Sequence, residues 1–113
     1  MVEESARRET SSARTGQAVV HCKKFKFSGH AIRRMFEQQV MPEHVIEAVN
    51  NGEIIASYSD DTPYPSSLIL GYAKQRPLHV VLAREDLSDT CQIITAYWPD
   101  PLIWRSDFKT RRK

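Results

Sequence analysis

The sequence is poor in cysteine and has no long hydrophobic run. Its two cysteines, Cys22 and Cys91, form no CxxC pair, so their spacing indicates neither a disulfide framework nor a zinc site. No window approaches the roughly 18 uninterrupted apolar residues that cross a bilayer, and residues 1–10 lack a basic-then-apolar signal pattern. We therefore expect a cytoplasmic protein without a membrane span, a metal or a cofactor.

Lysine and arginine are absent from residues 37–61, which contain six acidic residues, and are concentrated towards the two ends of the chain. Such asymmetry suits a polyanion that is contacted through one side of the molecule. A solvated tail and a solubilising terminus explain it equally well. The candidate RNA-binding cations are Arg33, Arg105, Lys109, Arg111 and Arg112.

The chain has the length and composition of one domain. It contains 113 residues, of which 41% are hydrophobic, and this is too apolar for a chain that is disordered throughout. Residues 1–22 are rich in Ser, Thr, Arg and Glu and show no apolar period. We predict a disordered tail over 1–22 and a single α+β domain over 23–113.

Two helices are predicted at the start of this domain. Ser28 is a good N-cap, and Ile32, Met35, Phe36 and Val40 recur at the spacing of one helical face. The first helix should span 29–39. The second helix should follow almost immediately, because proline is tolerated in a first helical turn at position 42, and the Asn-Gly pair at 51–52 can end it.

Four β-rich runs follow the helices, at residues 53–58, 66–73, 77–83 and 91–98. Their connections are too short for crossover helices, so neighbouring strands should be antiparallel. We predict an α+β fold in which two N-terminal helices pack on one face of a four-stranded antiparallel sheet. Residues 23–27 and 102–104 could each add a short strand.

His30, Arg34 and Glu37 are spaced to share one face of the first predicted helix. A histidine exchanges protons near neutral pH, and an arginine four residues later can hold phosphate. This pairing suits phosphodiester cleavage. The alternative is an exposed helix face with an ordinary salt bridge between Arg34 and Glu37.

His79 lies inside the most apolar run of the chain, on the strand face that it shares with Val81 and Ala83. A buried ring there needs a hydrogen-bond partner, so a satisfied core histidine is one interpretation. A second proton carrier that works with His30 is the other. Two histidines can divide the deprotonation of a ribose 2′-hydroxyl and the protonation of the leaving oxygen, and no metal is then required.

Thr95 and Tyr97 alternate onto one face of the last predicted strand. Their hydroxyls could bind phosphate or position a base. Both residues are also good strand formers, so routine strand composition explains them too.

Four sequence blocks occur in the order of a known family pattern. They are HAIRRM at 30–35, VMPEHVIEAVNNGEIIASYSDDTPYPSSLILG at 40–71, RPLHVV at 76–81 and ITAYWPDPLIW at 94–104. Together they resemble the domain-of-unknown-function 4258 family over residues 28–113. The four blocks in sequence are more specific than any one of them.

This resemblance implies a small bacterial or archaeal protein with a fold similar to the RelE and barnase-like ribonucleases, often encoded beside an antitoxin-type partner. It assigns a metal-independent endoribonuclease site to His30, Arg34, His79, Thr95 and Tyr97. The implied function is a toxin-like endoribonuclease of a toxin-antitoxin pair, with RNA and a cognate antitoxin protein as partners. The alternatives are a non-catalytic RNA- or protein-binding module and an interaction protein that pairs through a strand edge.

One departure from the family pattern falls near this site. Many relatives carry an arginine where this chain has Gln38. A missing cation there would weaken phosphate binding unless Arg33 substitutes for it.

Overall fold

The computed structural model describes residues 20–62, 64–85 and 87–112. The predicted tail lies outside these residues as far as position 19. Residues 20–22, which the sequence assigned to that tail, pack on the domain, because Val20 is buried in the core and Cys22 is bonded to Cys91.

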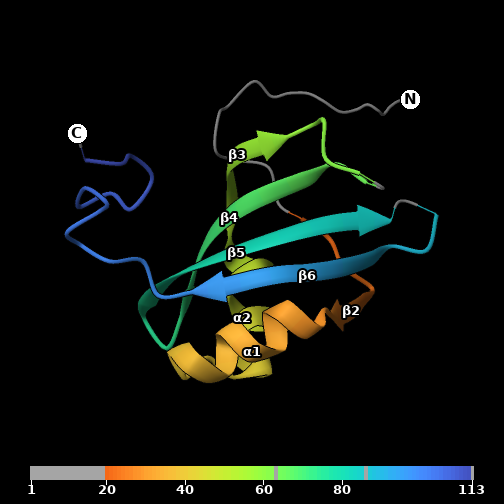
Figure 1. Ribbon diagram of the computed structural model, residues 1–113, viewed down its shortest axis with the longest axis horizontal. Helices are drawn as coiled ribbons and strands as arrows, with labels where there is room; N and C mark the ends of the chain where they lie inside the picture. Colours follow the sequence, from red (N-terminus) through yellow and green to blue (C-terminus); the bar gives the residue numbers. More distant parts are fainter. Residues whose placement is uncertain (1–19, 63, 86, 113) are drawn as a thin grey trace.

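Five strands form one mixed sheet in the order β2-β6-β5-β4-β3 (Figure 1). They are β2 (Lys24–Phe27), β3 (Glu53–Tyr58), β4 (Ser66–Ala73), β5 (Arg76–Glu85) and β6 (Thr90–Tyr97). The last four pair antiparallel as predicted, but β2 joins the sheet parallel to β6. The four-stranded antiparallel sheet was therefore a wrong prediction, although the α+β class is compatible with the structure. The sequence of β2 carries only a short alternation, and its partner strand lies far along the chain, so no local signal specified the pairing.

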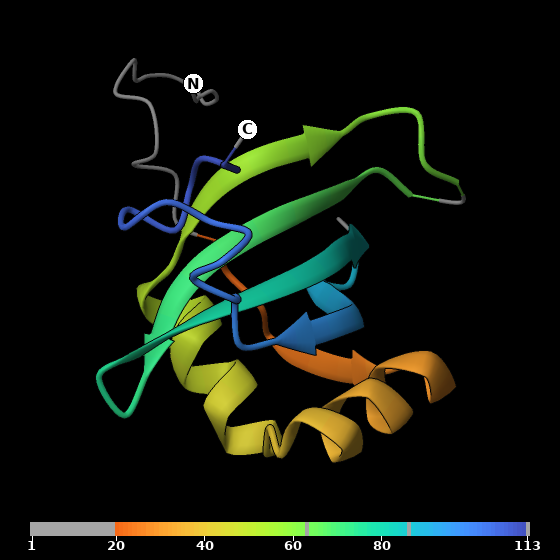
Figure 2. The ribbon, with the colours of Figure 1, turned by 60° about the vertical axis from the view of Figure 1, so that its left-hand side comes forward.

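Two helices, α1 (Gly29–Gln38) and α2 (Pro42–Asn51), pack together on one side of the sheet (Figure 2). Ser28 is the N-cap of α1, and its side-chain oxygen accepts a hydrogen bond from the Ala31 amide at 3.0 Å. Gln39 ends α1 in the left-handed conformation with φ 59°. Pro42 then occupies the first turn of α2, where its missing amide hydrogen costs nothing.

The buried face of α1 differs from the predicted apolar stripe. Ala31 and Met35 are buried, but Ile32 is 58% exposed and Phe36 is 85% exposed. The helix packs against β6, which is next to the edge strand β2. Large apolar side chains are therefore left on its outer side.

The second helix lies unusually close to the sheet. A Cβ atom added at Gly71 of β4 would meet the Ala48 carbonyl oxygen at 1.9 Å, so only glycine permits this approach. The Asn51 side chain then bonds both backbone groups of Tyr72 at 2.8 Å. These contacts fix the end of α2 on β4.

The segment after β6 folds back over the sheet on the side opposite the helices (Figure 2). An ion pair of 2.8 Å joins Lys109 to Glu53 of β3, and the backbones of Trp104 and Arg111 form an isolated bridge. Residues 102–104 thus contribute one bridge and no regular strand. Residues of the C-terminal segment therefore form one side of a cleft at the start of β5 and the finish of β6.

The two cysteines form a disulfide bond, with Cα atoms 5.5 Å apart. The sequence did not indicate a disulfide, because a lone pair of cysteines separated by 69 positions has no recognisable spacing. The parallel pairing of β2 with β6 brings Cys22, two residues before β2, close to Cys91 near the start of β6. Among the described residues, no helix is long and apolar enough to cross a membrane.

Candidate functional site

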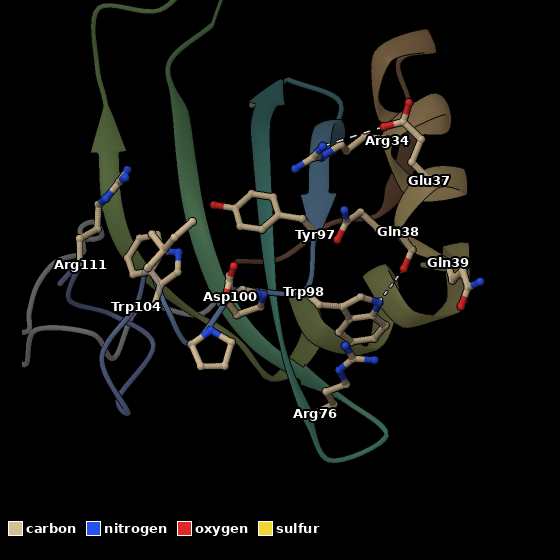
Figure 3. Close-up of a pocket in the computed structure, with 13 residues that line it drawn as sticks. Arg34, Glu37, Gln38, Gln39, Arg76, Tyr97, Trp98, Asp100, Trp104 and Arg111 are labelled. Carbon is tan, nitrogen blue, oxygen red and sulfur yellow. Dashed lines mark hydrogen bonds and ion pairs between the residues drawn. The ribbon is translucent and has the colours of Figure 1, made fainter.

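A cleft of about 720 Å³ lies between the C-terminal half of α1, the ends of β5 and β6, and the C-terminal segment (Figure 3). Side chains from all of these elements line it. They are Arg34, Glu37, Gln38, Gln39, Arg76, Tyr97, Trp98, Pro99, Asp100, Pro101, Ile103, Trp104 and Arg111. The lining is thus rich in arginine and in aromatic rings.

Each of the three arginines lies near one aromatic ring. The guanidinium carbon of Arg76 is 4.1 Å from the Trp98 ring centroid. The corresponding distances are 5.7 Å for Arg111 and Trp104, and 6.0 Å for Arg34 and Tyr97. All three fall within the range of cation–π attraction. Three guanidinium groups with aromatic neighbours therefore surround one cleft, and Arg76 makes the closest of the three contacts.

Two acidic side chains also line the cleft. Glu37 approaches Arg34 at 3.9 Å, which is a long contact between exposed groups and contributes little energy. Asp100 accepts a hydrogen bond from the Leu102 amide at 2.8 Å, which holds its carboxylate in a turn. In the described part of the chain, neither Arg76 nor Arg111 forms an ion pair. The cleft is thus lined by three arginines and two carboxylates. Its excess of positive charge would attract an anion.

His79 is fully buried below this cleft and is held at both ring nitrogens. Nε2 lies 2.8 Å from the Phe108 carbonyl oxygen, and Nδ1 lies 3.2 Å from the Tyr97 hydroxyl. A carbonyl only accepts, so Nε2 donates to Phe108, and neutral Nδ1 can accept from Tyr97. Burial lowers the pKa of His79, and the bond to the Phe108 carbonyl opposes this effect. His79 is therefore an interior histidine with hydrogen-bond partners at both ring nitrogens. One of these partners, the Tyr97 hydroxyl, belongs to a residue that lines the cleft.

Tyr97 presents its hydroxyl between Arg34 and Arg111 in the view of Figure 3. Burial raises the pKa of Tyr97, with a further contribution from Tyr58, while the charges of Arg111 and Arg34 oppose the rise. The phenol accordingly keeps its proton at neutral pH. It can donate one hydrogen bond and accept another.

Three other residues predicted on the helix and the strand are outside the cleft that Arg34 and Tyr97 line. His30 is exposed in the first turn of α1, Arg33 is exposed on the same helix, and Thr95 is half-buried in β6. None of the three lines the cleft. The structure thus brings Arg34 and Tyr97 together and keeps His79 one hydrogen bond behind them, whereas His30 is not part of the group.

The basic C-terminal residues have different environments. Arg111 lines the cleft, Lys109 pairs with Glu53, and the Arg112 Nε donates to the Pro101 carbonyl at 2.8 Å. Arg105 is exposed and does not line the cleft. Of the four cations predicted in this segment, one faces the cleft.

Sequence reasoning missed Arg76, Trp98 and Trp104 as site residues. Arg76 begins β5, and Trp98 directly follows β6, so they become diagonal neighbours across the antiparallel pair that joins His79 to Tyr97. A correct prediction of the register between β5 and β6 would have placed Arg76 beside Trp98. Within the described residues, no group of three or more His, Cys, Asp or Glu side chains could hold a metal ion.

No curated protein and no solved structure matches the chain significantly. The model of the family described as Domain of unknown function (DUF4258) matches residues 27–98, which is more than half of the chain. This match covers α1, α2 and all strands of the sheet except most of β2. The chain therefore belongs to the DUF4258 family.

Proposed function

We propose that this protein binds RNA in the cleft between α1 and the C-terminal segment. The supporting observation is the convergence of Arg34, Arg76 and Arg111 in one cleft, each near an aromatic ring. Arginine binds phosphate with a planar fork of donors and is the usual cation of RNA-binding surfaces. An exposed salt bridge would explain one such arginine, but not three from separate parts of the chain.

The first experiment compares two triple variants by fluorescence anisotropy with a labelled single-stranded RNA in EDTA. One variant replaces the cleft cations by R34A, R76A and R111A. The matched control replaces exposed cations outside the cleft by R33A, R105A and K26A, so that the two proteins have the same net charge.

We expect the cleft variant to bind RNA at least about 100-fold more weakly, because three phosphate contacts are lost. The control should stay within about threefold of the original protein. Equal losses in both variants would show that general charge, rather than the cleft, binds RNA. Thermal unfolding of each protein checks that it is folded.

A second candidate function is metal-independent RNA cleavage, which the contact between Tyr97 and His79 favours. In this step the Tyr97 oxygen takes the proton of a ribose 2′-hydroxyl and passes its own proton to His79 Nδ1. The 2′-oxygen then attacks phosphorus, the bond to the 5′-oxygen breaks, and that oxygen takes a proton from water. The hydroxide that remains takes the proton of His79 back through Tyr97, which restores both side chains. The products are a 2′,3′-cyclic phosphate and a free 5′-hydroxyl.

This relay differs from the two-histidine mechanism that the sequence suggested. His30 has no role in it, because it is outside the cleft, and His79 acts through Tyr97, because it is buried. The lowered pKa of His79 makes the relay a weak base at neutral pH, so we expect slow cleavage. The likeness to RelE and barnase-like ribonucleases, which the family resemblance implies, likewise stays a proposal.

The substitution Y97F tests cleavage separately from binding, because it removes the hydroxyl and keeps the ring. With a labelled RNA in EDTA, we expect cyclic-phosphate product from the original protein and none from the variant, at similar RNA affinity. Cleavage by the variant at the original rate would rule out the relay. Binding without product from either protein would leave RNA binding as the function.

A cognate antitoxin protein stays a prediction of the family resemblance. Exposed large apolar side chains, such as those of Ile32, Phe36 and Met41, are the kind of surface that a protein partner covers. Co-expression with the product of the neighbouring reading frame tests this prediction. Co-purification of the two chains that F36E abolishes would support it, and separate elution would contradict it.

A further inference from the structure

The aromatic rings of the cleft are already occupied by other side chains of the protein. Trp98 contacts Arg76 at 4.1 Å and His44 at 5.6 Å between centres. Its indole nitrogen also donates to the Gln38 carbonyl at 2.9 Å, which fixes the ring against the end of α1. The ring thus has a cation and a second ring as neighbours and one hydrogen bond that fixes its position.

The other two rings are engaged in a similar way. Trp104 contacts Arg111 at 5.7 Å and His79 at 4.5 Å, and only 8% of its surface is exposed. Tyr97 has Arg34 at 6.0 Å and His79 at 5.3 Å. Sequence-tolerant proteins that bind single strands by stacking leave aromatic faces open for the bases. In this cleft, by contrast, each of the three rings has an arginine guanidinium as a neighbour.

An arginine placed over a ring is prepared to bind phosphate. The ring orients the guanidinium plane, and the N–H groups point outward in that plane, where they can form paired bonds to phosphate oxygens. Less side-chain freedom is then lost on binding. Arg76 is such a group at 4.1 Å from its ring, and Arg111 and Arg34 lie near theirs at 5.7 Å and 6.0 Å. Together they suit the backbone of a nucleic acid.

We propose that the cleft recognises the sugar-phosphate backbone of single-stranded RNA and has little preference among bases. This inference rests on the proposed RNA binding and specifies which part of the RNA is contacted. Phosphate contacts position a strand but carry no sequence information. The protein should therefore accept any base at each position in the cleft.

The test measures dissociation constants for labelled 12-residue oligomers of uridine, adenosine and cytidine, and for an abasic ribose-phosphate oligomer of the same length. We expect all four values to agree within about threefold. A single base stacked on an open aromatic ring is worth at least about a fivefold change in affinity. A loss beyond fivefold with the abasic oligomer, or a tenfold preference for one base, would overturn the proposal.

Salt dependence gives an independent measure of the same contacts. For single-stranded RNA, three neutralised phosphates predict a slope of about −2 for the logarithm of affinity against that of salt concentration. Each of R34A, R76A and R111A should reduce the magnitude of this slope by about 0.7. R33A serves as the control and should leave the slope unchanged. An unchanged slope in all three cleft variants would also overturn the proposal.

The variant R76K tests the role of the ring support. It keeps the charge but replaces the planar fork with a flexible ammonium group. We expect about threefold to tenfold weaker binding from R76K, and no change from R33K. Equal RNA affinity of R76K and the original protein would contradict the proposal that Trp98 orients the Arg76 guanidinium for phosphate. If none of the four oligomers binds, the proposed RNA binding itself fails, and this outcome is distinct from binding with a base preference.

Discussion

The two ends of β6 have opposite characters. At its start, Cys91 is bonded to Cys22, and the Arg84 guanidinium pairs with Asp89 and donates to the His21 carbonyl at 2.9 Å. At its finish, Tyr97 opens onto the cleft, where guanidinium groups lie near aromatic rings. We call the start of β6 the closed end, because a disulfide bond and an ion pair join its neighbouring segments. We call its finish the open end, because it lies beside the cleft, where Arg76 and Arg111 form no ion pair among the described residues.

This difference agrees with the proposal that the cleft at the finish of β6 binds RNA. An arginine paired with a carboxylate has satisfied its charge within the chain, as Arg84 and Asp89 have done. Arg76 and Arg111 have aromatic support but no ion pair among the described residues. A bound anion would supply the missing charge. The start of β6 stabilises the domain, and the finish is available to a ligand.

The largest expected effect comes from opening the closed end. In the oxidised protein, C22S should lower the free energy of unfolding by about 4 kcal/mol, since the bond closes a long loop in the unfolded chain. Urea denaturation measures this loss, and RNA affinity should change less than twofold. Unchanged stability, or two titratable thiols in the original protein, would show that the bond does not form. Such bonds are rare in reducing compartments, so the assay requires oxidising buffer.

The next largest effect is expected from His79, which is buried beside Tyr97 at the open end of β6. H79A should lower the free energy of unfolding by about 3 kcal/mol, because it removes a fully buried ring and its two hydrogen bonds. H30A is the matched control and should cost less than about 0.5 kcal/mol, since His30 is exposed. Urea denaturation compares the two. Similar losses from both histidines would contradict the difference in their environments.

Acid should weaken the stabilisation that His79 provides. Burial depresses the pKa of His79 in the folded protein, so below the ordinary histidine pKa of about 6.5 the unfolded chain binds the extra proton. Stability is then fully present above this pH and falls as the pH decreases, by at most about 1.4 kcal/mol per pH unit from this group. Urea denaturation from pH 7.5 to 5.5 measures the slope. The slope should be smaller in H79Q, and an equal slope would assign the effect to other groups.

The smallest effect is expected from cations near the closed end. Lys24 and Lys26 are exposed on β2, beside the start of β6. Replacing both by alanine should change RNA affinity less than about threefold, because they do not line the cleft. Anisotropy against R76A, for which we expect about a tenfold loss, makes the comparison. A larger loss from the lysine pair would move the binding surface to the other end of β6.

Much of the local structure could be predicted from the sequence. Ser28 indicated the start of α1, and the Asn51-Gly52 pair indicated the end of α2, whose last residue is Asn51. The four runs of β-forming residues correspond to β3, β4, β5 and β6. Capping and strand preference act between residues that are close along the chain. Such signals can be recognised without knowledge of distant contacts.

The candidate site was predicted less completely. Arg34, Tyr97 and Arg111 were named from the sequence and do line the cleft, but Arg76, Trp98 and Trp104 were missed. The apolar run around His79 allowed two interpretations, and the fold of the C-terminal segment decided between burial and exposure. The spacing of His30 and Arg34 on one helix could not show that only the arginine reaches the cleft.

The sequence by itself determined the helices, the four main strands and the cationic character of the C-terminal segment, because these depend on neighbouring residues and on composition. The tertiary structure decided that β2 adds a parallel edge strand, that Cys22 meets Cys91, and that three arginines converge. Each of these features joins segments that are distant in sequence. Their positions follow from strand register and packing, which are properties of the whole folded chain.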